Sequence, residues 1–285
     1  MGTSSSNRGP KGRTDLLPSW YDGGGAPPPD GGPKEGAPPA GPDGKPAPPV
    51  QVPPQKTDDW KGAKGAITRY SKHTAGYAVR KAAGMYVRSL GGAGGARRSA
   101  SGSIRAGSRL AGFLTSVASG GPGGGGLDRT LTDLGLSASV GTTSEETLTR
   151  LADMLAPEGS TNDEAIVRDA VLETLDTLYK SILDQDGDLS MLEQMTPAMI
   201  KEAVMEFVGN YIYKKWLYEL GLAVEKNTVS EREAVMMERE VKDFIHAEVI
   251  ESMRGKEVKD FSLDAPSNRD TIDKIFQLAY STLEQ

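Results

Sequence analysis

Cysteine is absent from this chain of 285 residues, and histidine occurs only twice, as His73 and His246. Without thiols the chain has no disulfide scaffold, no cysteine-ligated zinc or iron–sulfur cluster and no cysteine nucleophile. Two histidines do not make a multi-histidine metal site, and they make a Ser-His-Asp triad improbable. We therefore expect no metal, no cofactor and no catalytic residue, and a protein that is not an enzyme.

Long apolar runs are also missing. No stretch approaches the ~18–20 apolar residues that a helix needs to cross a bilayer. The opening MGTSSSNRGP lacks the apolar segment of a secretory signal. A cysteine-free chain without these signals suits a reducing compartment, so we expect a cytoplasmic protein with no membrane partner.

Glycine, proline and charge are unevenly distributed. Residues 1–126 hold 28 of the 35 glycines and 15 of the 18 prolines, with 17 Lys and Arg against 7 Asp and Glu. Residues 127–285 hold 16 Lys and Arg against 32 Asp and Glu, so the two parts carry formal charges of +10 and −16. We expect three regions: a Pro/Gly-rich tail (1–56), a basic Gly-rich region (57–126) and an acidic helical domain (127–285).

The tail is of low complexity, with proline pairs alternating with glycine and aspartate. Such a segment cannot bury enough apolar surface to offset the entropy lost on ordering, so we expect it to be disordered, with local polyproline II character. One apolar island interrupts it, formed by Leu16, Leu17, Trp20 and Tyr21. We interpret this island as a short docking motif; the alternative is an incidental apolar cluster.

The basic region has 11 Lys and Arg and no acidic residue between Trp60 and Leu127. Its apolar spacing predicts two weak helices, at 60–90 and about 103–118. Their glycines weaken the prediction, because each costs a helix ~1 kcal/mol relative to alanine. A glycine-rich break is expected at 91–95 and a linker at 120–126.

The cations of the basic region permit two interpretations. Arg97, Arg98, Arg105 and Arg109 provide clustered charge of the kind that neutralises phosphates, which predicts a nucleic-acid-binding adaptor using residues 60–110. Alternatively, the region lies on the acidic domain or binds an acidic partner. No helix-turn-helix or zinc-finger motif decides between them.

Residues 127–285 are predicted to form five or six helices, which makes the fold class all-α. Capping boxes mark three helix starts, at Thr143…Glu146, Thr161…Glu164 and Ser230…Glu233. No alternating strand pattern is present. Four helices carry apolar stripes at helical spacing: Val167, Val171, Leu175, Leu178 and Ile182; Ile200, Val204, Phe207, Val208, Tyr211 and Ile212; Met237, Val241, Phe244, Ile245 and Val249; and Ile272, Ile275, Phe276, Ala279, Tyr280 and Leu283.

Asp184, Asp186 and Asp188 resemble the opening of a calcium loop, with carboxylates at positions 1, 3 and 5. Position 6 is Leu189 rather than glycine, and position 12 is Met195 rather than glutamate. We therefore interpret the segment as a polar turn that also caps the next element, with weak cation binding as the alternative.

The opening of the chain resembles a known family. Gly2-Thr3-Ser4-Ser5-Ser6, Gly9-Pro10 and Leu17-Pro18-Ser19-Trp20 precede a Pro/Gly-rich spacer and a helical C-terminal region. This layout is similar to that of QatB, the component without recognised enzymatic motifs in the four-gene Qat anti-phage defence systems of bacteria. The specific part of the resemblance covers about the first 20 residues.

The resemblance implies three partners: a QueC-like enzyme, an ATPase and a TatD-like nuclease. QueC-like enzymes activate a carboxy-deazaguanine with ATP and join it to an amine. Family membership thus suggests that Gly2, freed by removal of Met1, is the acceptor, and that Leu16, Leu17, Trp20 and Tyr21 contact the enzyme. Gly2 also fits the N-myristoylation pattern. The bacterial origin that the resemblance implies argues against this modification. We expect a non-enzymatic defence component that is both substrate and scaffold.

Overall fold

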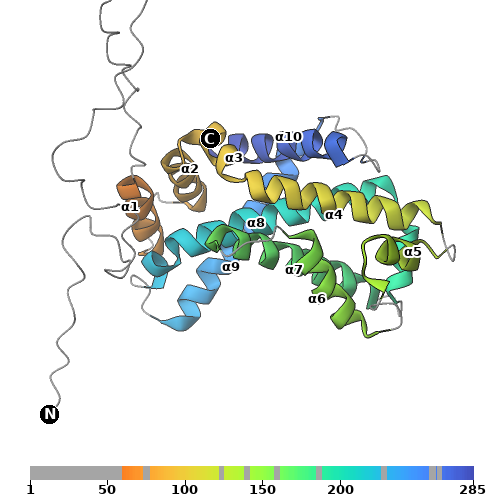
Figure 1. Ribbon diagram of the computed structural model, residues 1–285. Helices are drawn as coiled ribbons and strands as arrows, with labels where there is room; N and C mark the ends of the chain where they lie inside the picture. Colours follow the sequence, from red (N-terminus) through yellow and green to blue (C-terminus); the bar gives the residue numbers. More distant parts are fainter. Residues whose placement is uncertain are drawn as a thin grey trace, which may run out of the picture. The chain divides into compact units, whose positions relative to one another are not determined.

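A computed structural model describes residues 60–72, 78–121, 125–137, 142–156, 161–183, 188–225, 230–256, 261 and 265–285. The expected disordered tail, with Gly2, Leu16, Leu17, Trp20 and Tyr21, lies outside these residues. Within them the elements are helices, without a strand, which confirms the all-α fold class (Figure 1). The helices are α1 (Trp60–Ser71), α2 (Val79–Ser89), α3 (Gly92–Ser99), α4 (Ser101–Ser119), α5 (Gly126–Asp133), α6 (Ser144–Leu155), α7 (Asn162–Leu183), the short 3-10 helix η2 (Leu189–Gln194), α8 (Pro197–Glu225), α9 (Glu231–Met253) and α10 (Ala265–Leu283).

The three predicted capping boxes stand at helix starts. Thr143 Oγ1 accepts a hydrogen bond from the Glu146 backbone N–H at α6, over 3.3 Å. At α7, the Thr161 backbone N–H donates to Glu164 Oε2 over 2.8 Å, while the Glu164 N–H donates to Thr161 Oγ1 over 3.4 Å. Ser230 accepts from the Glu233 N–H at α9. These starts were predictable because a capping box is local in sequence.

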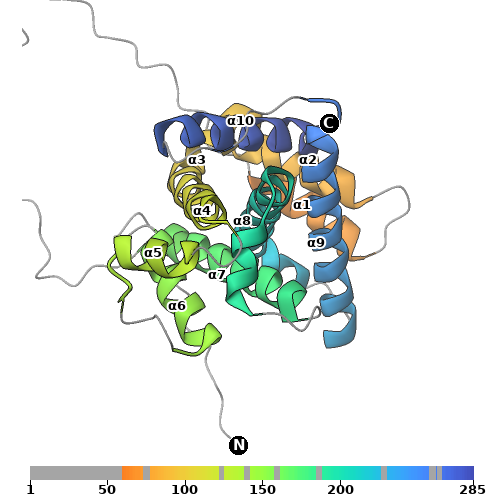
Figure 2. The same ribbon diagram turned by 90° about the vertical axis from the view of Figure 1, so that its right-hand side faces the viewer.

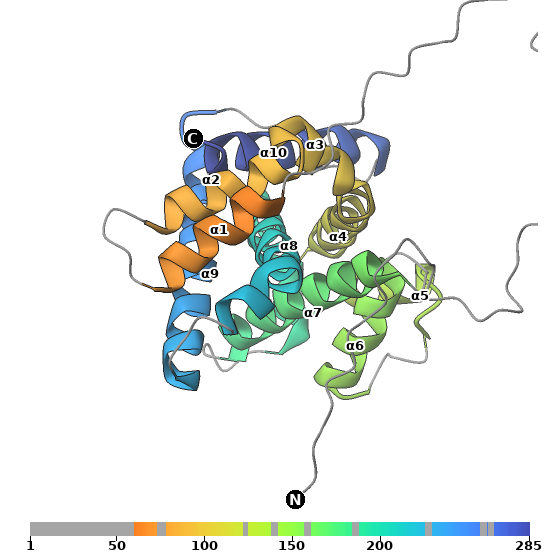
Figure 3. The ribbon, with the colours of Figure 1, turned by 90° about the vertical axis from the view of Figure 1, so that its left-hand side faces the viewer.

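Helix α8 lies at the centre of the arrangement, in contact with α1, α4, α7, α9 and α10. Figures 2 and 3 show these helices around it. The four predicted stripes face this core: all their side chains are buried except Leu178 and Phe244, which are partly buried against it. Burial of such stripes contributes the dominant favourable term in folding, at about 25 cal/mol per Å² of apolar surface.

The basic region is more ordered than predicted. The expected single helix at 60–90 is divided between α1 and α2, and the expected break at 91–95 is largely occupied by α3. Helix α4 packs against α8 and α10, and α1 packs against α8. Residue 126 therefore does not separate two cores: side chains of α1–α4 share one buried cluster with those of α5–α10, and residues 56–285 form one unit.

Two glycines of this region, Gly107 and Gly62, mark close approaches between helices. A Cβ on Gly107 of α4 would lie 2.8 Å from Cε1 of Phe207 in α8. One on Gly62 of α1 would lie 2.7 Å from Cε of Met85 in α2. The helices tolerate the propensity cost of ~1 kcal/mol per glycine because the missing side chain lets the neighbour approach.

Of the segment between α7 and η2, the structure describes Asp188. Asp188 Oδ1 accepts a hydrogen bond from the Ser190 backbone N–H over 2.8 Å and so caps η2. This confirms the predicted capping of the next element. Asp184 and Asp186 lie outside the described residues.

Candidate binding groove between α4, α5 and α6

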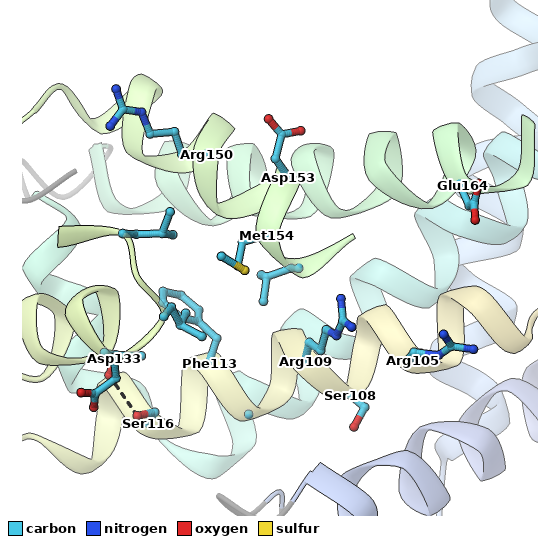
Figure 4. Close-up of a pocket in the computed structure, with 15 residues that line it drawn as sticks. Arg105, Ser108, Arg109, Phe113, Ser116, Asp133, Arg150, Asp153, Met154 and Glu164 are labelled. Carbon is cyan, nitrogen blue, oxygen red and sulfur yellow. Dashed lines mark hydrogen bonds between the residues drawn. The ribbon is translucent and has the colours of Figure 1, made fainter. Parts of the chain in front are cut away.

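A groove of about 950 Å³ lies between α4, α5 and α6 (Figure 4). Ligand sites in proteins commonly have volumes of about 300–1,000 Å³ and apolar walls with a few convergent polar groups. The apolar wall here consists of Phe113, Leu134, Leu136, Met154 and Leu155. The groove therefore has the size and lining of a binding site.

Two arginines of the basic region lie along one side of the groove. Arg105 and Arg109 are one turn apart on α4, followed a turn later by Phe113, because residues four apart share a helix face. Both arginines are exposed. Arg109 Nη1 donates to the backbone oxygen of Ala156, at the end of α6, over 3.3 Å. Figure 4 shows Arg109 between Phe113 and Arg105.

Carboxylates share the groove with these cations. Asp133, Asp153 and Glu164 line it together with Arg105, Arg109 and Arg150, so its charged side chains sum to zero. Asp153 forms an ion pair with Arg168 over 3.0 Å. Hydrogen bonds from the Thr161 backbone N–H and hydroxyl lower the pKa of Glu164 below its ordinary value.

The other two predicted arginines lie elsewhere. Arg97 of α3 binds Asp273 of α10, with Nη1 2.6 Å from Oδ2. Arg98 is an exposed residue of α3. The structure thus brings Arg105 and Arg109 together in the groove but does not place Arg97 or Arg98 there.

Other contacts join the basic region to acidic helices. Arg80 of α2 binds Glu248 of α9 and stacks over the Phe244 ring, with its guanidinium carbon 5.4 Å from the ring centroid. Arg88 donates to the Glu284 backbone oxygen over 3.1 Å. Arg80 and Arg97 therefore pair with carboxylates of the chain itself, and Arg88 binds a backbone oxygen.

A polar network between α7, α8 and α9 was not predictable from sequence. His246 Nδ1 lies 3.1 Å from Glu206 Oε2, and Asn210 donates to Thr174 Oγ1 over 3.1 Å. The hydrogen bond from His246 lowers the pKa of Glu206. These partners lie on separate helices, so no local spacing connects them.

Glu173, on the same interface, binds two lysines. Lys214 Nζ lies 2.7 Å from Glu173 Oε2, and Lys242 binds Oε1. Burial by itself would raise the pKa of Glu173, but the two lysines lower it overall. The partly buried charge of Glu173 is therefore paired twice, which offsets its desolvation.

A second polar cluster joins α7 to α8. Asp163 Oδ1 accepts hydrogen bonds from the Tyr211 hydroxyl, over 3.1 Å, and from Lys215 Nζ, over 2.7 Å. Burial raises the pKa of Glu219, one turn beyond Lys215. Burial also raises the pKa of Tyr211 well above its usual value. These groups bind one another rather than line the groove.

The described residues contain no group of three or more His, Asp or Glu side chains placed to hold a metal ion. No described helix has the length and apolar character required to cross a membrane. The fold and groove define an all-α protein with a groove of mixed charge.

The particular family follows from comparison with known proteins. The family model of QatB, described as Qat anti-phage system associated protein QatB, matches residues 91–283. This match covers more than half of the chain, so the chain belongs to the QatB family and has a role in the Qat anti-phage system. The family suggested by the resemblance is thereby confirmed, while the first 20 residues lie outside the matched range. No curated protein and no solved structure matches the chain.

Proposed function

We propose that this chain is a non-enzymatic Qat component with two roles. Its helical domain is a scaffold for other proteins of the system, and its N-terminal segment is a protein substrate, with Gly2 as the acceptor for a QueC-like enzyme. The observation that carries the scaffold role is the groove between α4, α5 and α6, with its apolar wall and balanced charge. Such a surface suits a protein segment, which presents apolar groups and both signs of charge.

The substrate role is supported by the sequence before α1. About 58 residues separate Gly2 from Trp60. The sequence predicts that this segment is disordered, and a disordered chain of that length has an end-to-end distance of roughly 40 Å and a fully extended limit near 200 Å. Gly2 is thus able to enter a partner's active site while the scaffold holds another surface, and Leu16, Leu17, Trp20 and Tyr21 are proposed to dock beside it.

The test of the substrate role is the intact mass of the full chain, purified after expression with and without the QueC-like enzyme. We expect an added mass that maps to the N-terminal peptide, and none for Gly2→Glu, whose large side chain keeps the initiator methionine. An unchanged N-terminal peptide overturns the substrate role. Co-purification of the chain with the other Qat proteins tests the scaffold role separately.

The second candidate is a nucleic-acid-binding adaptor using residues 60–110. The 11 cations without an acidic residue between Trp60 and Leu127 favour it. The Arg97–Asp273 pair and the carboxylates around Arg105 and Arg109 weigh against it, because they cancel the charge that phosphates need. Charge reversal at Arg97, Arg98, Arg105 and Arg109 is the test: an adaptor of this kind loses binding, and its affinity falls steeply with salt.

A further inference from the structure

We propose that the groove between α4, α5 and α6 binds a short segment of a partner protein in which an acidic residue stands beside bulky apolar residues. This inference rests on the proposed scaffold function and adds the chemistry of the partner. Its basis is the juxtaposition of an arginine pair with an apolar wall in one groove (Figure 4).

The arginine pair supplies the site for the acidic residue. Neither Arg105 nor Arg109 forms an ion pair with a carboxylate of the described residues. The Ala156 oxygen accepts from Arg109 Nη1 and so fixes this guanidinium near the end of α6, while its other N–H groups remain able to donate. A guanidinium binds a carboxylate through two parallel N–H···O bonds, which gives direction as well as affinity.

The apolar wall supplies the site for the bulky residues. Met154 of α6 is 40% exposed although it is a large apolar side chain. Figure 4 shows Met154 and Phe113 on opposite sides of the groove, with Arg109 next to Phe113. Methionine is unbranched and polarisable, so it adapts to irregular partners and packs well against aromatic rings. An apolar side chain of the partner that covers Met154 also comes close to Arg109.

The balance of charge favours a protein segment over nucleic acid. Three carboxylates line the same groove as its three arginines. A nucleic-acid strand carries a negative charge at every phosphate and would meet Asp133 and Asp153 as well as the arginines. A segment with one acidic residue places that charge at Arg105 and Arg109 and leaves Asp133, beyond Phe113 in Figure 4, free of a like charge.

The experiment uses the full chain with a photo-crosslinking amino acid in place of Met154, purified with the other Qat proteins. Mass spectrometry identifies the cross-linked partner peptide. We expect a peptide with Asp or Glu next to a bulky apolar residue. We expect R105E/R109E to weaken the complex about tenfold or more. Replacing the acidic residue of the partner peptide with Lys should then restore binding to this variant.

The matched control is R232E/K274E, which reverses two exposed cations of α9 and α10 outside the groove and outside residues 60–110. It should change affinity less than about twofold. If R105E/R109E unfolds at a lower temperature than the control, R105Q/R109Q replaces it, because both side chains are exposed and glutamine introduces no charge. R105Q/R109Q should then weaken the complex in the same direction.

Three outcomes overturn the inference while leaving the scaffold function standing. They are a complex that forms without a cross-link at residue 154, a cross-link to nucleic acid within a complex, and equal effects of the two double reversals. Failure to form any complex overturns the scaffold function and this inference together. The N-terminal mass shift is independent of all four outcomes.

Discussion

The imidazole of His246 lies over Gly209, and its Nδ1 is 3.1 Å from Glu206 Oε2. A Cβ on Gly209 would lie 2.8 Å from both Cε1 and Nδ1 of His246. Helix α9 therefore approaches α8 at a point where α8 has no side chain. The position of the His246–Glu206 pair depends on this gap.

Replacing Gly209 with alanine should destabilise the protein. The new methyl group must displace the His246 ring, and overpacking of this kind costs about 1–3 kcal/mol, offset by up to ~1 kcal/mol of gained helix propensity. Urea unfolding measures the difference. Gly65→Ala is the control, because a Cβ on Gly65 of α1 has no neighbour within 4 Å. Equal stability of the two variants would contradict the proposed role of Gly209.

Acid should weaken the fold through Glu206. Its pKa is lowered from the ordinary 4.5 by the hydrogen bond from His246. A group whose pKa is lower in the folded state stabilises the fold above its unfolded pKa, and this contribution is lost as the pH falls through the folded pKa. The free energy of unfolding should therefore fall below about pH 4.5, and less steeply for Glu206→Gln.

The pH experiment has an internal comparison. The pKa of Glu173 is also lowered, so Glu206→Gln should not remove the whole acid dependence, and adding Glu173→Gln should flatten the curve further. Urea unfolding at a series of pH values between about 5 and 3 measures the slopes. Parallel curves for the wild type and Glu206→Gln would show that Glu206 does not contribute.

The Arg97–Asp273 ion pair should couple α3 to α10. Both side chains are about one-third exposed, so we expect a coupling energy of only about 0.2–1 kcal/mol. A double-mutant cycle with Arg97→Ala and Asp273→Ala measures it. The coupling should decrease in 1 M salt, because ions screen exposed pairs. A coupling energy of zero at low salt would mean that this ion pair does not contribute to stability.

Glu193 should stabilise the start of α5. Its Oε1 accepts a hydrogen bond from the Leu127 backbone N–H over 3.0 Å, and the side chain is only 4% exposed. Glu193→Ala removes this acceptor and its charge from a helix N-terminus, at a cost of about 1–2 kcal/mol. Amide hydrogen exchange across α5 measures the local effect. Glu193→Gln keeps an acceptor and should cost less; identical exchange in both variants would argue against a capping role.

The helices with local signals were predictable from sequence, whereas α3 was not. The segment Gly92-Ala93-Gly94-Gly95 predicts a break, because glycine disfavours a helix. Its helical form depends on α10 and the residue after it: the Glu284 side chain accepts from the Ala93 backbone N–H over 2.9 Å, and Asp273 binds Arg97. These partners lie more than 170 positions further along the chain, and no window of sequence contains them.

Two of the four arginines singled out in the sequence, Arg105 and Arg109, line one groove, and the carboxylates around them were not foreseen. Arg105 and Arg109 lie on one helix face because of their spacing, which the sequence gives directly. The carboxylates that share their groove come from α5, α6 and α7, so the balance of charge appears only when these helices pack. The charge counted along the basic region therefore predicted a more positive surface than the folded groove has.

Helix α10 packs against α2, α3, α4, α8 and α9. A ribosome makes all five of those helices before α10. At a synthesis rate of about 5–20 residues per second, α10 is completed roughly 10–40 s after α2. Until then the faces of α2, α3 and α4 that pack against α10 lack part of their final covering. Transiently exposed apolar surface promotes aggregation, so a stop codon within α10 should leave the first-made helices prone to aggregate.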